Sequence, residues 1–413
     1  MRTLRIVGVV GVACVVACGC GIGPRAIRRE RASYNIALQQ TASEQMLLNL
    51  VRLKYREPTL FLEVGSISAH FEYLTEIEGI GTFVRGGADA YTGRLMPSYS
   101  EQPTITYAPL QGEAYVSRII AEVTLSRLGP LYSGGWHIDR MLRILLERAG
   151  DLRNDPKAPA ARDETRRPYE KLMEVAQIWR ELQKKGDIAF LTPMKEVAVA
   201  SGLRAEQVTP QCIMAADKEG YRFCPGKDGT WELRKSCPCG LIIQAAYAEE
   251  KDADAVDAAL KIKPARTRDR AGRFVERIRL TTFSDIREGG ESAEIAEVPV
   301  QVRSLNGILF YLGQGVEVPT AHLAKGLVKA YKDEQGKLVD RRETTRDLLD
   351  VHCSATRPAD AYVAVRYRGH WFYVADSDVD SKDTFSLLLI LFALQSGDVK
   401  SAQPLLTIPV GGR

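Results

Sequence analysis

The chain has few of the residues and motifs on which the common enzyme classes depend. Its 413 residues include five histidines, and none of them has a partner at the H-E-x-x-H spacing of zinc hydrolases. The patterns G-x-S-x-G, G-x-x-x-x-G-K-[ST] and G-x-G-x-x-G are absent. The sequence therefore indicates no catalytic residue, and it predicts neither a cofactor nor a metal centre.

Neither sign of charge dominates, and long apolar segments are missing. Lysine and arginine total 56 and aspartate and glutamate 52, which gives a formal net charge of +4. No large basic surface is predicted, so nucleic acid is not an expected partner. An apolar run covers residues 6–17, but a membrane-spanning helix needs about 20 such residues. The run has the length of the apolar core of a secretory signal peptide, about 7–15 residues.

This run ends in the stretch VVACGC, residues 15–20, where two cysteines stand among small residues. Val15-Val16-Ala17-Cys18 resembles the lipobox of bacterial lipoproteins. The resemblance implies that the Cys18 thiol receives a diacylglycerol, that residues 1–17 are removed as a signal peptide, and that the new amine is acylated. Cys14 and Cys20 are weaker candidates, because glycine and alanine stand three positions before them. The alternative is an ordinary signal peptide or an uncut helix.

The residue after the lipobox bears on location. Gly19, rather than aspartate, follows Cys18, which resembles the outer-membrane sorting signal of lipoproteins in enteric-type bacteria. The expected location is the bacterial cell envelope, with the chain lipid-anchored in the outer membrane and facing the periplasm. The expected partners are the membrane, through the N-terminal lipid, and another envelope protein.

Composition divides the mature chain into three parts. A polar, proline-bearing stretch covers residues 151–167, and a second charged stretch covers residues 249–273. Regular apolar patterns lie outside these stretches. We therefore expect residues 18–150 and 298–413 to form one core, with residues 151–297 as a linker and inserted middle region. The sequence predicts an α+β fold in which helices pack on small antiparallel sheets, with an inserted Cys-containing middle segment.

Several elements can be predicted from local patterns. Helical patterns cover residues 26–56, with a break near Ser43, and also 113–123 and 137–150. β-like segments cover 59–73, 79–87 and 103–110. Residues 361–367 and 370–376 predict a hairpin around Arg368-Gly369. A buried helix capped at Asp380 or Ser381 and a strand at 404–410 would complete a β-β-α-β layer.

The mature chain also resembles a known group. The segments EQMLLNLVRLKYREPTLFLEV, VRSLNGILFYLGQGVEVP and AYVAVRYRGHWFYVADSDVDSKDTFSLLLILFALQ are similar to those of an uncharacterised family of predicted bacterial lipoproteins. The resemblance covers residues 26–150 and 298–411 and omits the cysteine-bearing middle. It implies a location and a core built from both ends, and it implies no chemistry.

Four cysteines of the middle region lie within 28 residues: Cys212, Cys224, Cys237 and Cys239. An oxidising compartment favours disulfides between them. A hairpin around the Gly-Lys-Asp-Gly turn at 226–229 would bring Cys224 near Cys237 and Cys239. A zinc site, suggested by the short CPCG knuckle, and free thiols remain open alternatives. We disfavour a Cys237–Cys239 bond because such close neighbours strain it.

The acidic stretch DSDVDSKD, residues 376–383, is the nearest approach to a ligand motif. It starts like a calcium loop, but Ser381 stands where the loop needs glycine, and Leu387 stands where it needs glutamate. We therefore interpret its aspartates as a hairpin end and a helix cap.

Two classes of function remain. The first is a membrane-anchored envelope lipoprotein that acts as a non-catalytic binding or assembly module. The second is an envelope hydrolase that acts on peptidoglycan or polysaccharide through carboxylates that the sequence does not identify. We favour the first class, because hydrolases usually carry a recognisable site motif.

Overall fold

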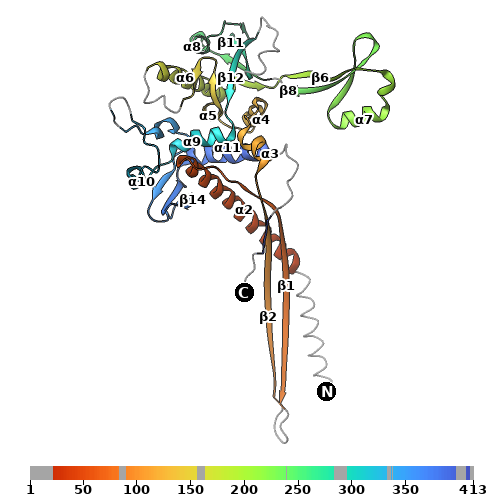
Figure 1. Cartoon of the computed structure of the whole chain (residues 1–413), viewed down its shortest axis with the longest axis vertical. Coiled ribbons are helices and arrows are strands. Elements are labelled where there is room, and N and C mark those ends of the chain that lie inside the picture. The colour runs from red at the N-terminus through yellow and green to blue at the C-terminus, as the bar shows by residue number, and fades with distance from the viewer. Residues whose placement is uncertain are drawn as a thin grey trace. The chain divides into compact units, whose positions relative to one another are not determined.

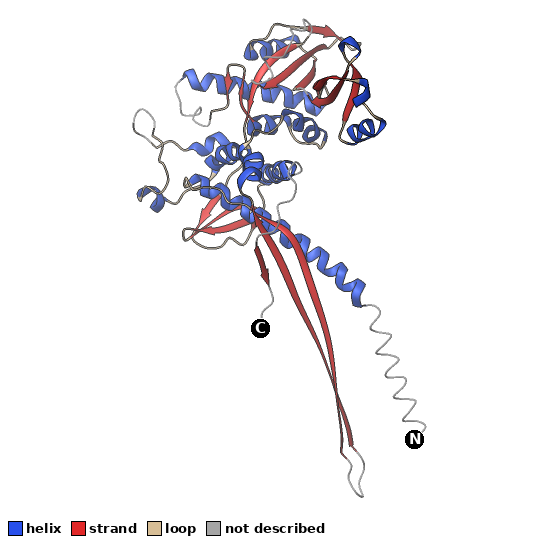
Figure 2. Ribbon diagram, turned by 45° about the vertical axis from the view of Figure 1, so that its right-hand side comes forward, coloured by secondary structure: helices blue, strands red, loops and turns tan. Residues whose placement is uncertain are grey.

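The computed structural model describes residues 22–82, 90–155, 163–238, 240–282, 295–332, 336, 338–396 and 406–409. The chain is an α+β protein with several small antiparallel sheets, as predicted (Figures 1 and 2). It divides into two compact units. The larger unit contains residues 1–57 and 121–391, and the ribbon unit contains residues 58–120 and 392–413.

The larger unit is built around a seven-stranded sheet in the order β4-β3-β12-β11-β9-β5, with β10 beside β11. Its strands are β3 Leu146–Ala149, β4 Leu152–Arg153, β5 Ile188–Leu191, β9 Leu241–Tyr247, β10 Arg266–Arg268, β11 Phe274–Thr282 and β12 Ala296–Val302. β11 and β12 run parallel, and the other neighbours are antiparallel. This sheet crosses the boundaries predicted at residues 151 and 297.

Apolar strands and two amphipathic helices form the core around this sheet. β9 has the sequence LIIQAAY, and Leu241, Ile243 and Tyr247 in it are fully buried. Helices α6 Asp163–Lys185 and α8 Glu250–Leu260 pack against each other and against β9. Trp179 of α6 donates from Nε1 to the Tyr247 hydroxyl at 3.2 Å, which satisfies a polar group inside an apolar layer.

Other helices of the larger unit pack against one another. Helix α9 Leu305–Leu312 contacts both α2 Ile22–Lys54 and α5 Ile138–Leu145. The predicted helix 137–150 is too long, because α5 ends at Leu145 and the chain continues directly into β3. Gly315 lies where two segments meet, since a Cβ atom there would approach the Leu349 carbonyl oxygen at 2.2 Å.

Helix α2 is continuous, so the predicted break near Ser43 is wrong. Ser43 donates from Oγ to the carbonyl of Gln39 at 2.9 Å, which is a bond back along the helix and not a cap. One face of the helix is buried, because Met46, Leu47, Leu50 and Val51 are at most 2% exposed. The helix ends at Lys54, within the predicted range of 26–56, and Arg56 follows with a positive φ of 64°.

The predicted hairpin is confirmed as β14 Ala361–Tyr367 and β15 His370–Ala375. Arg368 and Gly369 both have positive φ, 47° and 84°, as a two-residue turn of this kind requires. Strand β13 His352–Ser354 pairs with β15 to complete a three-stranded sheet. The predicted β-β-α-β layer is wrong in its last strand, since β16 Leu406–Pro409 pairs with β2 of the ribbon unit.

A separate three-stranded sheet contains β6 Met194–Leu203, β7 Tyr221–Pro225 and β8 Trp231–Pro238 in the order β6-β8-β7. The hairpin predicted around residues 226–229 is therefore confirmed. Helix α7 Pro210–Lys218 precedes β7, and the Thr209 hydroxyl caps it by accepting from the Cys212 amide at 3.3 Å.

The ribbon unit contains two long antiparallel strands, β1 Leu62–Thr82 and β2 Ala90–Pro109 (Figure 1). The three predicted β segments belong to this one pair, although residues 83–89 lie outside the described residues. The helix predicted over 113–123 is replaced by α3 Gly112–Tyr115 and a π-helical turn at Val116–Ile120. Arg118 of this turn is 4% exposed and forms a bidentate ion pair with Glu63.

Candidate functional site

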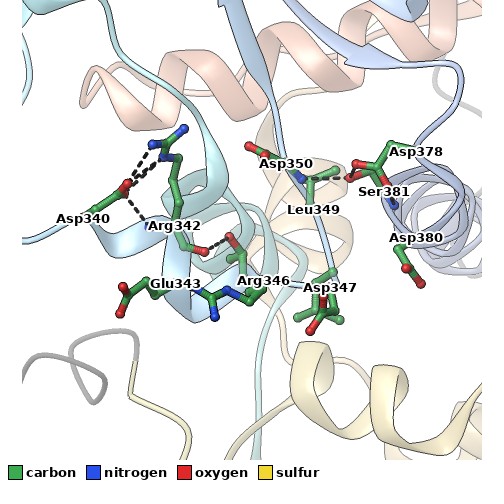
Figure 3. Close-up of a pocket in the computed structure, with 12 residues that line it drawn as sticks. Asp340, Arg342, Glu343, Arg346, Asp347, Leu349, Asp350, Asp378, Asp380 and Ser381 are labelled. Atoms are coloured by element: carbon green, nitrogen blue, oxygen red, sulfur yellow. Dashed lines mark hydrogen bonds and ion pairs between the residues drawn. The ribbon is translucent and has the colours of Figure 1, made fainter.

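The first candidate is an acidic cavity of about 460 Å³ in the larger unit (Figure 3). Segments 340–350 and 378–381 line it, the second at the start of helix α11 Val379–Ser396. Its carboxylates outnumber its two arginines, Arg342 and Arg346. The carboxylates belong to Asp340, Glu343, Asp347, Asp350, Asp378 and Asp380.

Local contacts already use three of these carboxylates. Asp378 accepts from the Ser381 amide at 3.0 Å and from its hydroxyl at 2.6 Å, so Asp378 caps α11 in place of the predicted Asp380 or Ser381. Asp380 accepts from Arg140 Nη2 at 2.6 Å. Arg342 donates to Asp340, and this bond holds the pKa of the Asp340 carboxyl below its usual range. These contacts explain the acidic stretch as capping and ion pairing.

The second candidate is a cavity of about 440 Å³ bounded by β3, β4, the end of β12 and α9. Its wall includes Arg303, whose side chain is 5% exposed. Arg303 Nη1 donates to the carbonyls of Arg143, Ile144 and Leu146 at 2.8–3.1 Å, and Nη2 donates to the Asn154 carbonyl at 2.6 Å. The guanidinium lies 4.2 Å from the Tyr311 ring centroid. Arg303 therefore joins the end of α5 to β12 and α9.

A third cluster is a buried carboxyl pair between α8 and β11. Glu276 is 1% exposed and Asp257 is 5% exposed. Arg266 donates to Asp257 Oδ2 and, at 2.7 Å, to Asp254 Oδ1. Apart from the Ala265 main chain, which acts on the Glu276 carboxyl, no described residue is placed to donate to that carboxyl or to Asp257 Oδ1. A proton on Glu276, shared with Asp257 Oδ1, satisfies both groups, and burial together with the Asp257 charge raises the pKa of Glu276 to about 8.

Substituting this carboxyl should make stability less dependent on pH. Because its pKa is higher in the folded chain than in the unfolded chain, Glu276 lowers the free energy of unfolding as pH rises from about 5 to 8. Glu276→Gln keeps the shape and cannot ionise. We expect the variant to gain about 2–4 kcal/mol over wild type between pH 5 and 9, measured by urea unfolding. A pH-independent difference between the two proteins would contradict the buried proton.

The site residues predicted from sequence have the following places. Cys18 and Cys239 lie outside the described residues. Cys212, Cys224 and Cys237 are free thiols. The register places Cys224 opposite Glu232, five residues before Cys237 on β8, which corresponds to about 16 Å. This separation exceeds the reach of a disulfide, so the hairpin does not bring Cys224 to Cys237 as expected. Disulfide formation in this region remains a prediction.

The described residues contain neither a metal site nor a spanning helix. No three or more His, Cys, Asp or Glu side chains among them are placed to hold a metal ion. None of the described helices is long and apolar enough to cross a membrane.

The ribbon unit offers a different kind of site, a long strand edge. After a bulge at Gly65, the register is regular from Ser66 to Thr82 on β1 and from Ala90 to Thr106 on β2.

Most of this ribbon lacks a third strand among the described residues. β16 covers β2 only at residues 104–107, and β1 pairs with β2 alone. A two-stranded ribbon is marginal in water, and stability requires a further strand or a packed element.

Comparison with known proteins gives no relative for this chain. No family model, curated protein or solved structure matches it.

Proposed function

We propose that this chain is a lipid-anchored lipoprotein of the bacterial envelope that acts as a non-catalytic assembly module, with the β1–β2 ribbon as its contact surface. The lipobox at residues 15–18 supports the anchor and the location at the outer membrane, facing the periplasm. The long strand pair supports the assembly role, and it is the observation that carries the proposal. Strands of 21 and 20 residues are far longer than the usual 5–6 and extend over about 70 Å.

The two edges of the ribbon are not equivalent. A proline fits within a ladder only where its nitrogen points away from the partner strand. Pro97 and Pro103 pair in register with β1, so they remove two donors from the outer edge of β2. Prolines at an edge prevent further strand pairing. β1 contains no proline, so its outer edge is continuous.

A second copy of this chain fits the β1 edge. It carries an edge of the same length and the same donor spacing, and two β1 strands can pair antiparallel around a twofold axis. The result is a four-stranded sheet, β2-β1-β1-β2, which meets the requirement for more than two strands. The proline-bearing β2 edges then lie outside and stop the sheet from growing.

Matched proline substitutions test this assembly. Ile77 and Leu95 are cross-strand partners in the register. Leu95 lies two residues from Pro97, so the N–H groups of Leu95 and Ile77 point away from the β1–β2 ladder, as the Pro97 nitrogen does. We expect Ile77→Pro to weaken dimerisation by about tenfold or more, because it removes a donor from the pairing edge. Leu95→Pro removes an apolar side chain of similar size, but the donor that it removes lies on the outer edge of β2, which does not pair in the dimer. This variant should therefore dimerise like wild type. The measurement is light scattering of the acylated protein in detergent over a concentration series.

The outcomes separate the possibilities clearly. Equal weakening by both substitutions would show that the loss of an apolar side chain, rather than the loss of a donor from the β1 edge, weakens the contact. A monomeric wild-type protein at all concentrations would overturn the assembly with a second copy.

A further inference from the structure

A buried histidine lies where three elements of the larger unit meet. His322 belongs to helix α10 Thr320–Ala324 and is 6% exposed. Tyr55 directly follows the last residue of α2 and is also buried, and its hydroxyl oxygen lies 2.6 Å from His322 Nδ1. His370, the first residue of β15, packs edge to face on His322 with 4.8 Å between the ring centroids. The β14–β15 hairpin itself packs against α2 (Figure 1).

The hydrogen bond between Tyr55 and His322 selects one protonation state of the imidazole. Burial raises the pKa of the Tyr55 hydroxyl, so this group keeps its proton. Within the described part of the chain, His322 Nδ1 is the acceptor that lies within hydrogen-bond distance of it. Nδ1 must therefore carry a lone pair, which leaves the ring proton on Nε2 and the imidazole neutral. Protonation of Nδ1 would deprive a buried O–H of its acceptor, which is unfavourable.

The charged groups around His322 also oppose its protonation. The side chains whose charges act on it are His370, Lys325 next to α10 and Arg368 in the hairpin turn, and all three are basic. Burial and these basic groups lower the pKa of His322 below its usual value. The carboxylate of Glu57 is directed elsewhere, because it accepts from Arg368 Nη2 at 2.6 Å.

The other titratable neighbours keep their charge state in mild acid. Burial raises the pKa of the Tyr367 hydroxyl on β14, and it raises the pKa of the Cys353 thiol on β13 to about 11. Hydrogen bonds from Arg368 and Tyr367 lower the pKa of Glu57, so its carboxylate stays ionised. Histidine is the residue type that titrates between pH 5 and 8. Of the two histidines in this cluster, His322 is the buried one.

We propose that His322 is a pH-sensitive contact, which holds the β14–β15 hairpin against α2 and α10 while it is neutral and releases the hairpin turn when it is protonated. Its contribution is complete above about pH 6.5, the ordinary histidine value, and it is lost as the pH falls through the lower value of the folded chain. The Glu57–Arg368 ion pair lies at the surface and contributes little by itself. The inference rests on the larger unit alone and is independent of the assembly proposed for the ribbon.

Hydrogen exchange of the acylated full-length protein in detergent tests this release. The rates at pH 7.5 and pH 5.0 are compared by mass spectrometry, after correction for the intrinsic pH dependence of exchange. We expect the amides of residues 365–372 to exchange about tenfold or more faster at pH 5.0, while β9 stays protected. No acceleration in the hairpin would overturn the proposal. Equal acceleration in the hairpin and in β9 would show global unfolding and would overturn it as well.

Matched histidine variants assign the response. His322→Asn places an amide oxygen close to the position of Nδ1, so it can still accept from Tyr55, but it cannot take up a proton. We expect the hairpin of this variant to stay protected at both pH values. His137→Asn removes another half-buried histidine, at the start of α5, and should respond to pH like wild type. A wild-type response in His322→Asn would assign the titration to another group and contradict the proposal.

A tyrosine variant tests the hydrogen bond directly. Tyr55→Phe keeps the aromatic ring and removes the hydroxyl that requires a neutral His322. Protonation then becomes easier, so the midpoint of hairpin opening should move to higher pH by about one unit, a tenfold change in the protonation equilibrium. An unchanged midpoint would show that the Tyr55 hydroxyl does not control the charge of His322, and the pH-sensitive contact would be wrong as described.

Discussion

Replacing Cys18 with alanine should abolish acylation and leave an uncleaved precursor. The signal peptidase of lipoproteins acts on the lipidated cysteine, and the lipobox resemblance identifies that residue as Cys18. We expect neither Cys14 nor Cys20 to replace it, because glycine and alanine stand three positions before them. Each buried methylene contributes about 0.8 kcal/mol to membrane binding, so loss of the acyl chains removes the lipid part of the anchoring energy, while the apolar run at residues 6–17 stays on the uncleaved chain.

Metabolic labelling with a palmitate analogue measures this result. We expect label on the wild-type chain, none on Cys18→Ala, and full label on the control Cys20→Ala. The mutant should also migrate as the larger precursor, longer by 17 residues. Equal labelling of wild type and Cys18→Ala would refute the assignment and with it the anchor in the proposed function.

Elements whose signals are local were predictable. The 361–376 hairpin depends on a two-residue turn with glycine, and the 221–238 hairpin depends on Gly-Lys-Asp-Gly. In each case the turn residues fix the register within a few positions. The α+β class follows from the same local patterns, because the mixture of helical and alternating segments determines it.

Elements that depend on distant partners were not predictable. Strand β3 pairs with β12, about 150 residues later, and the same apolar pattern LRILLERA reads equally well as one longer helix. Periodicity cannot distinguish these two outcomes for a short apolar run. β16 has a normal strand sequence, but nothing in it indicates β2 rather than β15 as its partner.

The burial of certain polar side chains was also not predictable from the sequence. Asn49, Asn154 and Arg303 are at most 5% exposed, although their residue types usually lie at the surface. Asn154 and Arg303 bind main-chain carbonyls. Every residue has such a carbonyl, so the sequence does not indicate which carbonyls a buried side chain will bind. The cavity that both residues line was therefore not predictable from the sequence, whereas the acidic stretch at 376–383 resembles a ligand motif.

Arg303→Met should reduce the free energy of unfolding by about 2–4 kcal/mol, because each buried carbonyl left without a donor costs about 1–3 kcal/mol. Carbonyls at the end of a helix have no partners within it, and the helix dipole makes them attractive to cations. Arg303 donates to the carbonyls of Arg143 and Ile144, at the end of α5, and to the carbonyl of Leu146. Methionine fills similar space and removes the Arg303 donor from the Ile144 and Asn154 carbonyls, whereas Asn154 Nδ2 still donates to the carbonyls of Arg143 and Leu146.

Urea unfolding of matched variants measures the effect. Arg303→Lys keeps the charge, but a single ammonium cannot reach the four carbonyls that two guanidinium nitrogens bind, so we expect an intermediate loss. The exposed Arg270→Met is the control and should stay within about 0.5 kcal/mol of wild type. If Arg303→Met were as stable as this control, water or rearranged side chains would be satisfying the carbonyls. Arg303 would then not be the link that joins α5, β12 and α9.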